Sequence, residues 1–185
     1  MSNKKPMILV FAGPNGSGKS TITQFFDKVG EYTNADEIVK STVMDNKDAA
    51  IYVYNKRYES IKENKDFTFE TVLSSKYNLD LLIKAKNDGY FIKCIFVLTI
   101  DPYVNVARVK SRVADGGHDV EEDKIISRYS KSLANIQTLL KICDIMHVYD
   151  NTTDTPVRII RKHKEDISIF PNKLWDEERI ISLMS

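Results

Sequence analysis

Hydrophobic positions along the chain fall into two alternating patterns. Short apolar runs, rich in β-branched and aromatic residues, are separated by longer stretches in which apolar residues recur at helical spacing. The runs predict strands at about 7–12, 31–35, 66–70, 91–100 and 145–149, and the longer stretches predict helices at about 19–28, 48–64, 76–88, 102–114 and 122–142.

This alternation predicts an α/β fold, with a parallel sheet of about five strands and helices on both faces. Runs 7–12 and 91–100 are almost continuously apolar, as central strands are when both faces are covered. With 185 residues, 42% of them hydrophobic, we expect residues 1–185 to fold as a single domain. Ligands of such sheets bind beyond the carboxyl ends of the strands, so polar residues that follow strands are the first candidates for a site.

The charge balance excludes some classes of partner. A formal net charge of +1 provides no overall field to attract nucleic acid or an acidic membrane, so we expect neither as a partner. Cys94 and Cys143 lie within apolar runs, which predicts buried, reduced thiols. The apolar run near the N-terminus is too short for a signal peptide, and no run reaches membrane-spanning length; we therefore expect a cytoplasmic protein.

A phosphate-binding motif follows the first predicted strand. The stretch 8–21 reads ILVFAGPNGSGKST, and its part from Gly13 to Ser20 matches G-x-x-x-x-G-K-[ST] between a strand and a helix. The glycines let backbone N–H groups converge on phosphate oxygens, Lys19 can reach the terminal phosphates, and the Ser20 hydroxyl can bind Mg²⁺. We therefore predict a site for a nucleoside triphosphate, ATP with Mg²⁺, made by Gly13, Pro14, Asn15, Gly16, Ser17, Gly18, Lys19, Ser20 and Thr21.

Acidic residues follow the next two strands. Asp36 lies just after the second strand, where its carboxylate could take the proton of a substrate hydroxyl; the alternative is that Asn34 or Asp36 only caps the next helix. Glu70 and Thr71 end the third strand and could bind the same hydroxylated substrate, the alternative being a solvated strand end. Asp101, followed by proline, is interpreted as a helix cap.

A pair of helices rich in arginine is predicted to form a lid at about 108–130. Arg108 and Arg112 are four residues apart and share a helix face, the turn Gly116–Gly117 follows, and Arg128 lies on the second helix. Guanidinium groups suit the charge that develops on a transferring phosphoryl group, and closure of a lid excludes water. His118, next to the glycines, is interpreted as a turn residue rather than a catalyst.

Together these stretches resemble the zeta-toxin family of P-loop kinases, in its shorter branch. The matching elements are GPNGSGKST, NADEI, FETVLSS, the lid segment with its Gly-Gly-His turn, and YDNT at 149–152. The resemblance implies a P-loop NTPase fold similar to nucleotide and shikimate kinases, with a mobile lid. It also implies transfer of the ATP γ-phosphate to UDP-N-acetylglucosamine and, as a partner, an antitoxin protein.

The resemblance also implies roles for individual residues. Asp36 would be the base that activates the acceptor hydroxyl, and Lys19 would hold the terminal phosphates. Glu70 and Thr71 would line the acceptor pocket, while Arg112 and Arg128 would stabilise the phosphoryl group. The chain is shorter than the well-studied members, and the resemblance does not name the acceptor of the shorter branch.

Three hypotheses for the function follow. The first is a kinase for a sugar or nucleotide-sugar such as UDP-N-acetylglucosamine, the second a kinase for a nucleoside, nucleotide or simple sugar, and the third an NTPase switch or binding module. The carboxylates and the arginine lid favour transfer. Residues 154–185 are expected to form a helical tail, in which the basic run at 158–164 is a solvated helix face, with contact to an acidic partner or RNA as the alternative.

Overall fold

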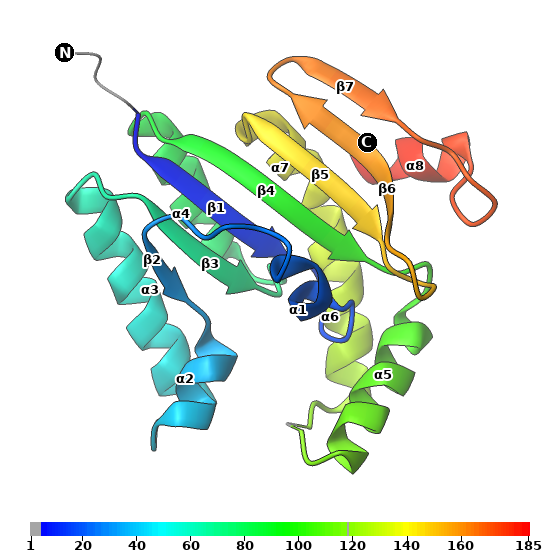
Figure 1. Cartoon of the computed structure of the whole chain (residues 1–185), viewed down its shortest axis with the longest axis horizontal. Coiled ribbons are helices and arrows are strands. Elements are labelled where there is room, and N and C mark those ends of the chain that lie inside the picture. Colours follow the sequence, from blue (N-terminus) through cyan, green and yellow to red (C-terminus); the bar gives the residue numbers. More distant parts are fainter. Residues whose placement is uncertain (1–4, 118) are drawn as a thin grey trace.

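The computed structural model describes residues 5–117 and 119–185, and in that part of the chain seven strands form one sheet in the order β2-β3-β1-β4-β5-β6-β7 (Figure 1). The strands are β1 Met7–Ala12, β2 Glu31–Thr33, β3 Phe67–Thr71, β4 Phe91–Leu98, β5 Ile145–Asp150, β6 Val157–His163 and β7 Asp166–Ile169. The helices of this part are α1 Lys19–Thr23, α2 Ala35–Ser41, α3 Asn46–Lys62, α4 Lys76–Asn87, α5 Pro102–Ala114, α6 Glu122–Ala134, α7 Ile136–Ile142 and α8 Glu177–Met184.

The predicted parallel sheet is confirmed for its first five strands, β1 to β5, with β1 and β4 at its centre. In β1 the side chains from Ile8 to Ala12 are at most 2% exposed, and in β4 those from Cys94 to Leu98 are equally buried. Both central strands are therefore covered on both faces. Burial of these continuous apolar runs fixes the middle of the fold.

Helices cover both faces, as predicted, but unequally. On one face Ile8 and Val10 pack with buried side chains of α3, α4, α7 and α8. On the other face Leu9 and Phe11 pack against Ile22 of α1 and the segment that follows it. Figure 1 shows the consequence, with α4 and α7 behind the sheet and only the short α1 in front.

Some predicted helix bounds were wrong. The helix expected at 19–28 ends at Thr23 and continues as turns, and the short helix α2 was not expected. The helix expected at 122–142 is interrupted at Asn135, whose side-chain amide donates to the carbonyl of Leu73. The apolar stripe passes across this break unchanged, so helical spacing alone could not reveal it.

The sheet has seven strands in place of the expected five or so, and the prediction of a helical tail at 154–185 was wrong. Residues 157–169 form an antiparallel hairpin, β6–β7, that extends the sheet beyond β5, and only 177–184 is helical. The basic run is therefore a strand. Lys162 is 5% exposed and its ammonium donates to the carbonyl of Leu140, while the neighbouring Arg161 is exposed. Because a lysine takes an inward-facing position, the sequence of β6 does not show the alternation of apolar and polar residues that would have predicted a strand.

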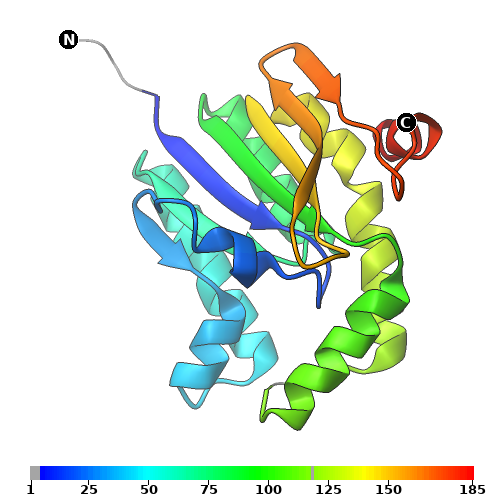
Figure 2. The ribbon, with the colours of Figure 1, turned by 45° about the vertical axis from the view of Figure 1, so that its right-hand side comes forward.

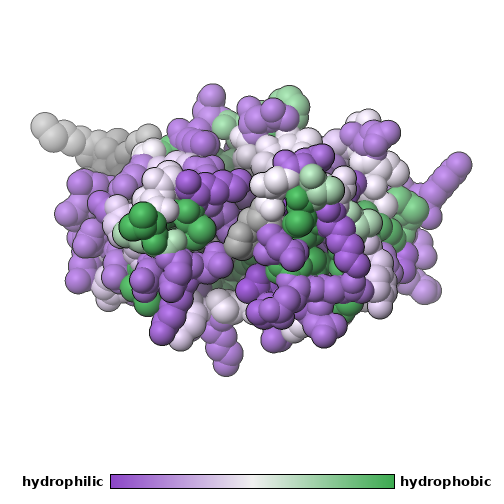
Figure 3. All heavy atoms as spheres, turned by 90° about the horizontal axis from the view of Figure 1, so that it is seen from below, coloured by the Kyte–Doolittle hydropathy of each residue, from purple (hydrophilic) through white to green (hydrophobic). Residues whose placement is uncertain are grey.

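Two arms extend beyond the carboxyl ends of the parallel strands (Figure 2). One contains α2 and the start of α3; the other is the antiparallel pair α5–α6, which shares the buried residues Val106, Val109 and Ile125. The end of the molecule that carries both arms has a mostly hydrophilic surface with a few apolar clusters (Figure 3). Within the described residues, no helix has the length and apolar character needed to cross a membrane.

Candidate functional site

The glycine-rich loop between β1 and α1 has a backbone that requires glycine. Gly13 has φ 141°, and a Cβ atom placed there would lie 2.0 Å from the carbonyl oxygen of Val97. Gly18 has φ 84°, and a Cβ atom there would lie 2.1 Å from the side-chain nitrogen of Asn151. The glycines therefore bring the loop against β4 and against the end of β5, which gives the predicted phosphate loop its shape.

This loop and both arms enclose one cavity. It has a volume of about 180 Å³ and is lined by Asn15, Gly16, Gly18, Lys19, Ser20, Asp36, Glu70, Arg108, Val109 and Arg112. Of the predicted site residues, the fold thus brings together five residues of the cradle, both candidate carboxylates and two of the three lid arginines, Arg108 and Arg112. They come from five elements or their ends, so only the tertiary fold assembles them.

Lys19 is 9% exposed, and its ammonium donates to the carbonyls of Gly13 at 2.8 Å and Pro14 at 3.1 Å. Burial lowers its pKa, and the nearby Arg112 lowers it further, while Glu70 and Asp36 raise it. The lysine is therefore folded back onto its own loop, in a position from which it can turn toward a phosphate chain.

The two candidate carboxylates also line the cavity. The side-chain oxygen of Asn34 accepts the backbone N–H of Asp36 at 3.0 Å, so Asn34 is the helix cap and the Asp36 side chain lines the cavity. Burial raises the pKa of Glu70, and the charge of Asp36 adds to this rise, whereas Lys19 lowers it. The Tyr32 hydroxyl donates to Glu70 Oε2 at 3.4 Å. Two carboxylates beside a buried lysine can hold, and deprotonate, a hydroxyl group.

Two other polar residues at strand ends, Thr71 and Asp101, have structural contacts. The Thr71 hydroxyl accepts hydrogen bonds from the Leu73 N–H and the Asn78 side chain, both at 3.0 Å, and Thr71 is not among the residues that line the cavity. Asp101 accepts the N–H of Tyr103 at 2.7 Å, with a proline at the start of α5. The prediction that Asp101 is a helix cap is therefore confirmed.

The three lid arginines occupy different places. Arg108 and Arg112 line the cavity, whereas Arg128 reaches the phosphate loop from α6, with its Nη1 3.3 Å from Asn15 Oδ1. Arg108 donates through Nη2 to the carbonyl of Thr152 at 3.1 Å, and its buried Nη1 has no hydrogen-bond partner in the described part of the chain. A buried donor that lacks a partner at a cavity wall suits an anionic ligand. His118 lies outside the described residues.

Two asparagines that brace the loop were not identified as such from the sequence. Asn105 is fully buried in α5; its amide nitrogen donates to the carbonyl of Asn15 at 2.7 Å, and its oxygen accepts from the Thr99 hydroxyl. The Asn151 amide donates to the carbonyl of Ser17 at 2.8 Å. In the sequence Asn151 is noted only as part of the YDNT stretch at 149–152.

The residues fit a metal ion that arrives with its phosphates. Among the described residues, no group of three or more His, Cys, Asp or Glu is arranged to hold a metal ion by itself. The exposed Ser20 at the start of α1 lines the cavity beside Asp36 and Glu70. This is the donor set expected for Mg²⁺, which takes few protein ligands and is bound mainly through phosphates and water.

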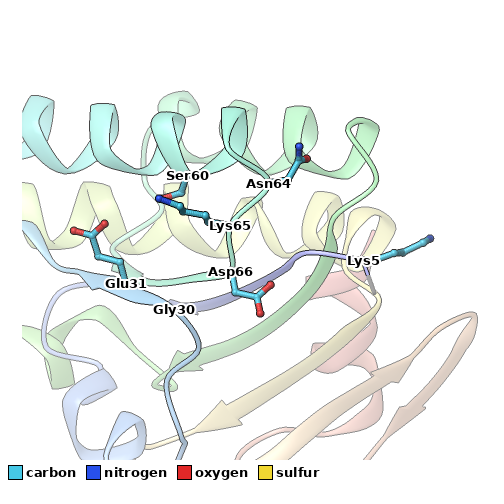
Figure 4. A pocket seen from close by; sticks show the side chains of 7 residues that line it. All are labelled: Lys5, Gly30, Glu31, Ser60, Asn64, Lys65 and Asp66. Atoms are coloured by element: carbon cyan, nitrogen blue, oxygen red, sulfur yellow. The ribbon is translucent and has the colours of Figure 1, made fainter. Parts of the chain in front are cut away.

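A second hollow, of about 550 Å³, lies at the opposite end of the sheet (Figure 4). It is lined by Lys5, Gly30, Glu31, Ser60, Asn64, Lys65 and Asp66. Two of its charged groups have partners in the fold, because Asp66 accepts the N–H of Met7 at 2.7 Å and Lys65 pairs with Glu63 at 2.6 Å. The hollow lies at the amino ends of the strands, away from the cradle, so it is not the candidate site.

Comparison with known proteins gives one relative in sequence. No family model matches the chain. An uncharacterized protein of Haemophilus influenzae is 30% identical over 135 residues, which cover 70% of this chain and 94% of that protein.

Solved structures share the fold. The structure from the PezAT chromosomal toxin-antitoxin system of Streptococcus pneumoniae matches 82% of this chain and 70% of that one, with a TM-score of 0.59 and 16% identity. The AvrRxo1-ORF1:AvrRxo1-ORF2 complex, solved with ATP, matches 98% of this chain and 64% of that one, with a TM-score of 0.72 and 12% identity. A protein of Chloroflexus aurantiacus named a putative kinase matches 70% of this chain and 80% of that one, with a TM-score of 0.51 and 14% identity. The predicted fold of the zeta-toxin-like P-loop kinases is thereby confirmed.

Proposed function

We propose that this chain, which belongs to one family with the Haemophilus influenzae protein and has the fold of the zeta-toxin-like P-loop kinases, is an ATP-dependent small-molecule kinase. It transfers the γ-phosphate of ATP to a hydroxyl group of a sugar or nucleotide-sugar, with UDP-N-acetylglucosamine as the first acceptor to test. Nucleosides, nucleotides and simple sugars form the next group of acceptors.

One observation carries the proposal: a single cavity is lined by both cations and carboxylates. Lys19 of α1 and Arg108 and Arg112 of α5 line it together with Asp36 of α2 and Glu70 of β3. A kinase needs both kinds of group, because a phosphate chain requires cations while the attacking hydroxyl requires a base. An NTPase switch can use carboxylates for Mg²⁺ or water, but it needs no base for an acceptor hydroxyl.

The reaction then follows from these side chains. Lys19 leaves the carbonyls of Gly13 and Pro14 and pairs with the terminal phosphates of ATP. Asp36 accepts the proton of the acceptor hydroxyl as its oxygen forms a bond to the γ-phosphorus, and the bond to ADP breaks. Arg112 and Arg128 stabilise the charge on the transferring group. Mg²⁺, held at Ser20, would neutralise phosphate charge when bound.

The proposal also includes an antitoxin-like partner protein and a cytoplasmic location. One structural neighbour comes from a toxin-antitoxin system and another is a complex of two proteins, which supports an antitoxin-like protein partner for this chain. A kinase that uses ATP and a nucleotide-sugar would act in the cytoplasm. Co-expression with the adjacent gene product, followed by size-exclusion chromatography, tests the partner directly.

The test of the kinase uses γ-labelled ATP, Mg²⁺ and a panel of hydroxylated acceptors headed by UDP-N-acetylglucosamine. Asp36→Asn removes the proposed base, and Glu37→Gln is the matched control, since Glu37 is the next residue of α2 and does not line the cavity. We expect label on an acceptor with wild type and Glu37→Gln, and a loss of about 100-fold or more with Asp36→Asn. Release of free phosphate alone, at a rate that Asp36→Asn leaves unchanged, would make an NTPase switch the better account.

A further inference from the structure

A buried arginine, Arg57, lies next to the backbone of Glu70 but does not line the cavity. Arg57 belongs to α3, and its side chain, 2% exposed, points toward the sheet with those of Val53 and Ile61. Its guanidinium carbon lies 4.3 Å from the centre of the Phe69 ring in β3. The arginine is thus enclosed between α3 and the carboxyl ends of β2 and β3.

The guanidinium donates hydrogen bonds to both of these strand ends. Its Nε donates to the hydroxyl of Thr33 at 2.9 Å, and its Nη2 to the carbonyls of Thr33 at 3.3 Å and Glu70 at 3.4 Å. Its Nη1 donates to Asn78 Oδ1 at 2.9 Å. One planar group therefore links the last residue of β2, the backbone of Glu70 and the first turns of α4.

The residues that accept these hydrogen bonds are connected to the segments that carry Asp36 and Glu70. Asn34, which caps α2 by accepting the N–H of Asp36 at 3.0 Å, follows Thr33 in the chain. Asn78, the partner of Nη1, donates at 3.0 Å to the hydroxyl of Thr71, the residue after Glu70. Arg57 therefore holds the backbone of Glu70 directly and that of Asp36 through Thr33 and the Asn34 cap, although its side chain bonds to neither carboxylate.

The free energy needed to bury the Arg57 cation argues against a role in packing alone. No carboxylate pairs with Arg57 in the described part of the chain, and its hydrogen-bond acceptors there are all neutral. Burial lowers its pKa to about 9. A cation buried without an opposite charge is less stable than an apolar side chain of the same volume, so packing alone would favour methionine or leucine at this position.

We propose that Arg57 is a positioning residue, which fixes the separation of Asp36 and Glu70 and so sets the geometry of the acceptor subsite. This inference rests on the proposed kinase function and adds a residue that neither the loop motif nor the cavity lining identifies. The fork geometry is essential, because three separate nitrogens bind acceptors on three elements, which an ammonium group cannot do.

Hydrogen exchange tests the positioning without any need for activity. Arg57→Met is compared with Lys162→Met, which also removes a buried lone cation, since Lys162 is 5% exposed and donates to the carbonyl of Leu140. We expect amide exchange in 33–38 and 69–73 to rise about tenfold or more in Arg57→Met, while 13–20 and 145–150 keep wild-type exchange. Lys162→Met should not affect the first two segments.

Kinetics then tests the consequence for the reaction. With the acceptor that wild type phosphorylates, Arg57→Met should lower kcat/KM for that acceptor by about 100-fold, while the dissociation constant for an ATP analogue changes less than about twofold. Arg57→Lys keeps the charge and much of the stem, so it remains available if Arg57→Met does not fold; we expect it to show both defects. Lys162→Met should retain wild-type kinetics.

The outcomes separate the two proposals. Unchanged exchange in 33–38 and 69–73, exchange raised equally over the whole sheet, or full rescue by Arg57→Lys would overturn the positioning role. Failure of the kinase proposal appears in wild type itself, as absence of transfer to any acceptor, and the exchange result then decides the positioning role without the kinetics.

Discussion

The side-chain amide of Asn151 donates a hydrogen bond to the backbone carbonyl of Ser17, at 2.8 Å and across 134 residues of sequence. Asn151 follows β5 directly and is 6% exposed, so this bond ties the end of a central strand to the glycine loop. The same amide nitrogen would lie 2.1 Å from a Cβ atom at position 18, which shows how closely the loop fits against this side chain.

Asn151→Leu should therefore weaken nucleotide binding. The substitution leaves the Ser17 carbonyl buried without its donor, which costs about 1–3 kcal/mol, and it introduces a branched side chain against Gly18. We expect the dissociation constant for a non-hydrolysable ATP analogue, measured by calorimetry, to rise about tenfold or more. Asn172→Leu is the control, because Asn172 bonds only to backbone of the 172–175 turn. Equal affinities in both variants would contradict the bracing role of Asn151.

Gly13→Ala should prevent formation of the loop. Both Gly13 and Gly89 have positive φ, at 141° and 90°, so alanine strains either backbone. Only at Gly13 does the new Cβ meet an atom, the carbonyl oxygen of Val97 at 2.0 Å, whereas nothing lies within 4 Å at Gly89. Gly89→Ala should lose about 1–2 kcal/mol, which corresponds to a fall of about 2–8 °C in the melting temperature.

Calorimetric melting, followed by titration with the ATP analogue, compares the two glycine variants. We expect Gly13→Ala either to melt well below Gly89→Ala or to lose nucleotide binding altogether. If Gly13→Ala binds the analogue as wild type does, then the close approach to Val97 does not shape the loop.

Glu70 should reduce stability at neutral pH. Burial and the charge of Asp36 raise its pKa in the folded protein above the value of an unfolded chain, so the folded state binds the proton more tightly. The stability linked to this proton is present below pH 4.5, and it is lost as the pH rises through the folded pKa. Glu70→Gln should accordingly melt above wild type at pH 7.5.

The Glu70 prediction is checked by melting curves of both proteins between pH 4 and 8. The advantage of Glu70→Gln should shrink as the pH falls and disappear near pH 4. A constant difference at every pH would mean that packing, and not the charge of Glu70, causes the change.

His147 should make the fold sensitive to mild acid. Burial, with the cations Arg158, Lys93 and Arg161, lowers its pKa from 6.5 to about 4. Between these two values the unfolded chain binds a proton that the folded protein rejects, so the free energy of unfolding falls as the pH drops through this window. Above pH 6.5 the imidazole is neutral in both states and the effect is absent.

His147→Phe, which keeps a ring at the position, should remove this part of the pH dependence. Urea unfolding of both proteins at pH 7.5, 5.5 and 4.5 measures it, and other groups cancel in the difference between variant and wild type. We expect the free energy of unfolding of His147→Phe, relative to that of wild type, to increase as the pH falls from 7.5 to 4.5. Parallel curves would show that His147 titrates normally in the folded protein.

Much of the fold and of the nucleotide side of the site could be predicted from the sequence, because both depend on short-range patterns. Central strands such as 7–12 are continuous apolar runs, the glycine loop is one uninterrupted motif, and the cap at Asp101 involves only its neighbours in the chain. The charged hairpin β6–β7 was missed because Lys162 occupies an inward position with its ammonium bonded to Leu140.

By itself, then, the sequence determined the order of the five parallel strands and the glycine motif that follows the first of them, since propensity, periodicity and turn residues act over a few positions. Only the tertiary structure decided that Asp36, Glu70 and Arg112 line one cavity and that Asn151 braces Ser17. It also decided that Arg57 donates hydrogen bonds to the ends of two strands instead of forming an ion pair. These contacts join residues from different elements, and a hydrogen bond between distant positions depends on how the whole sheet is packed, which no local pattern records.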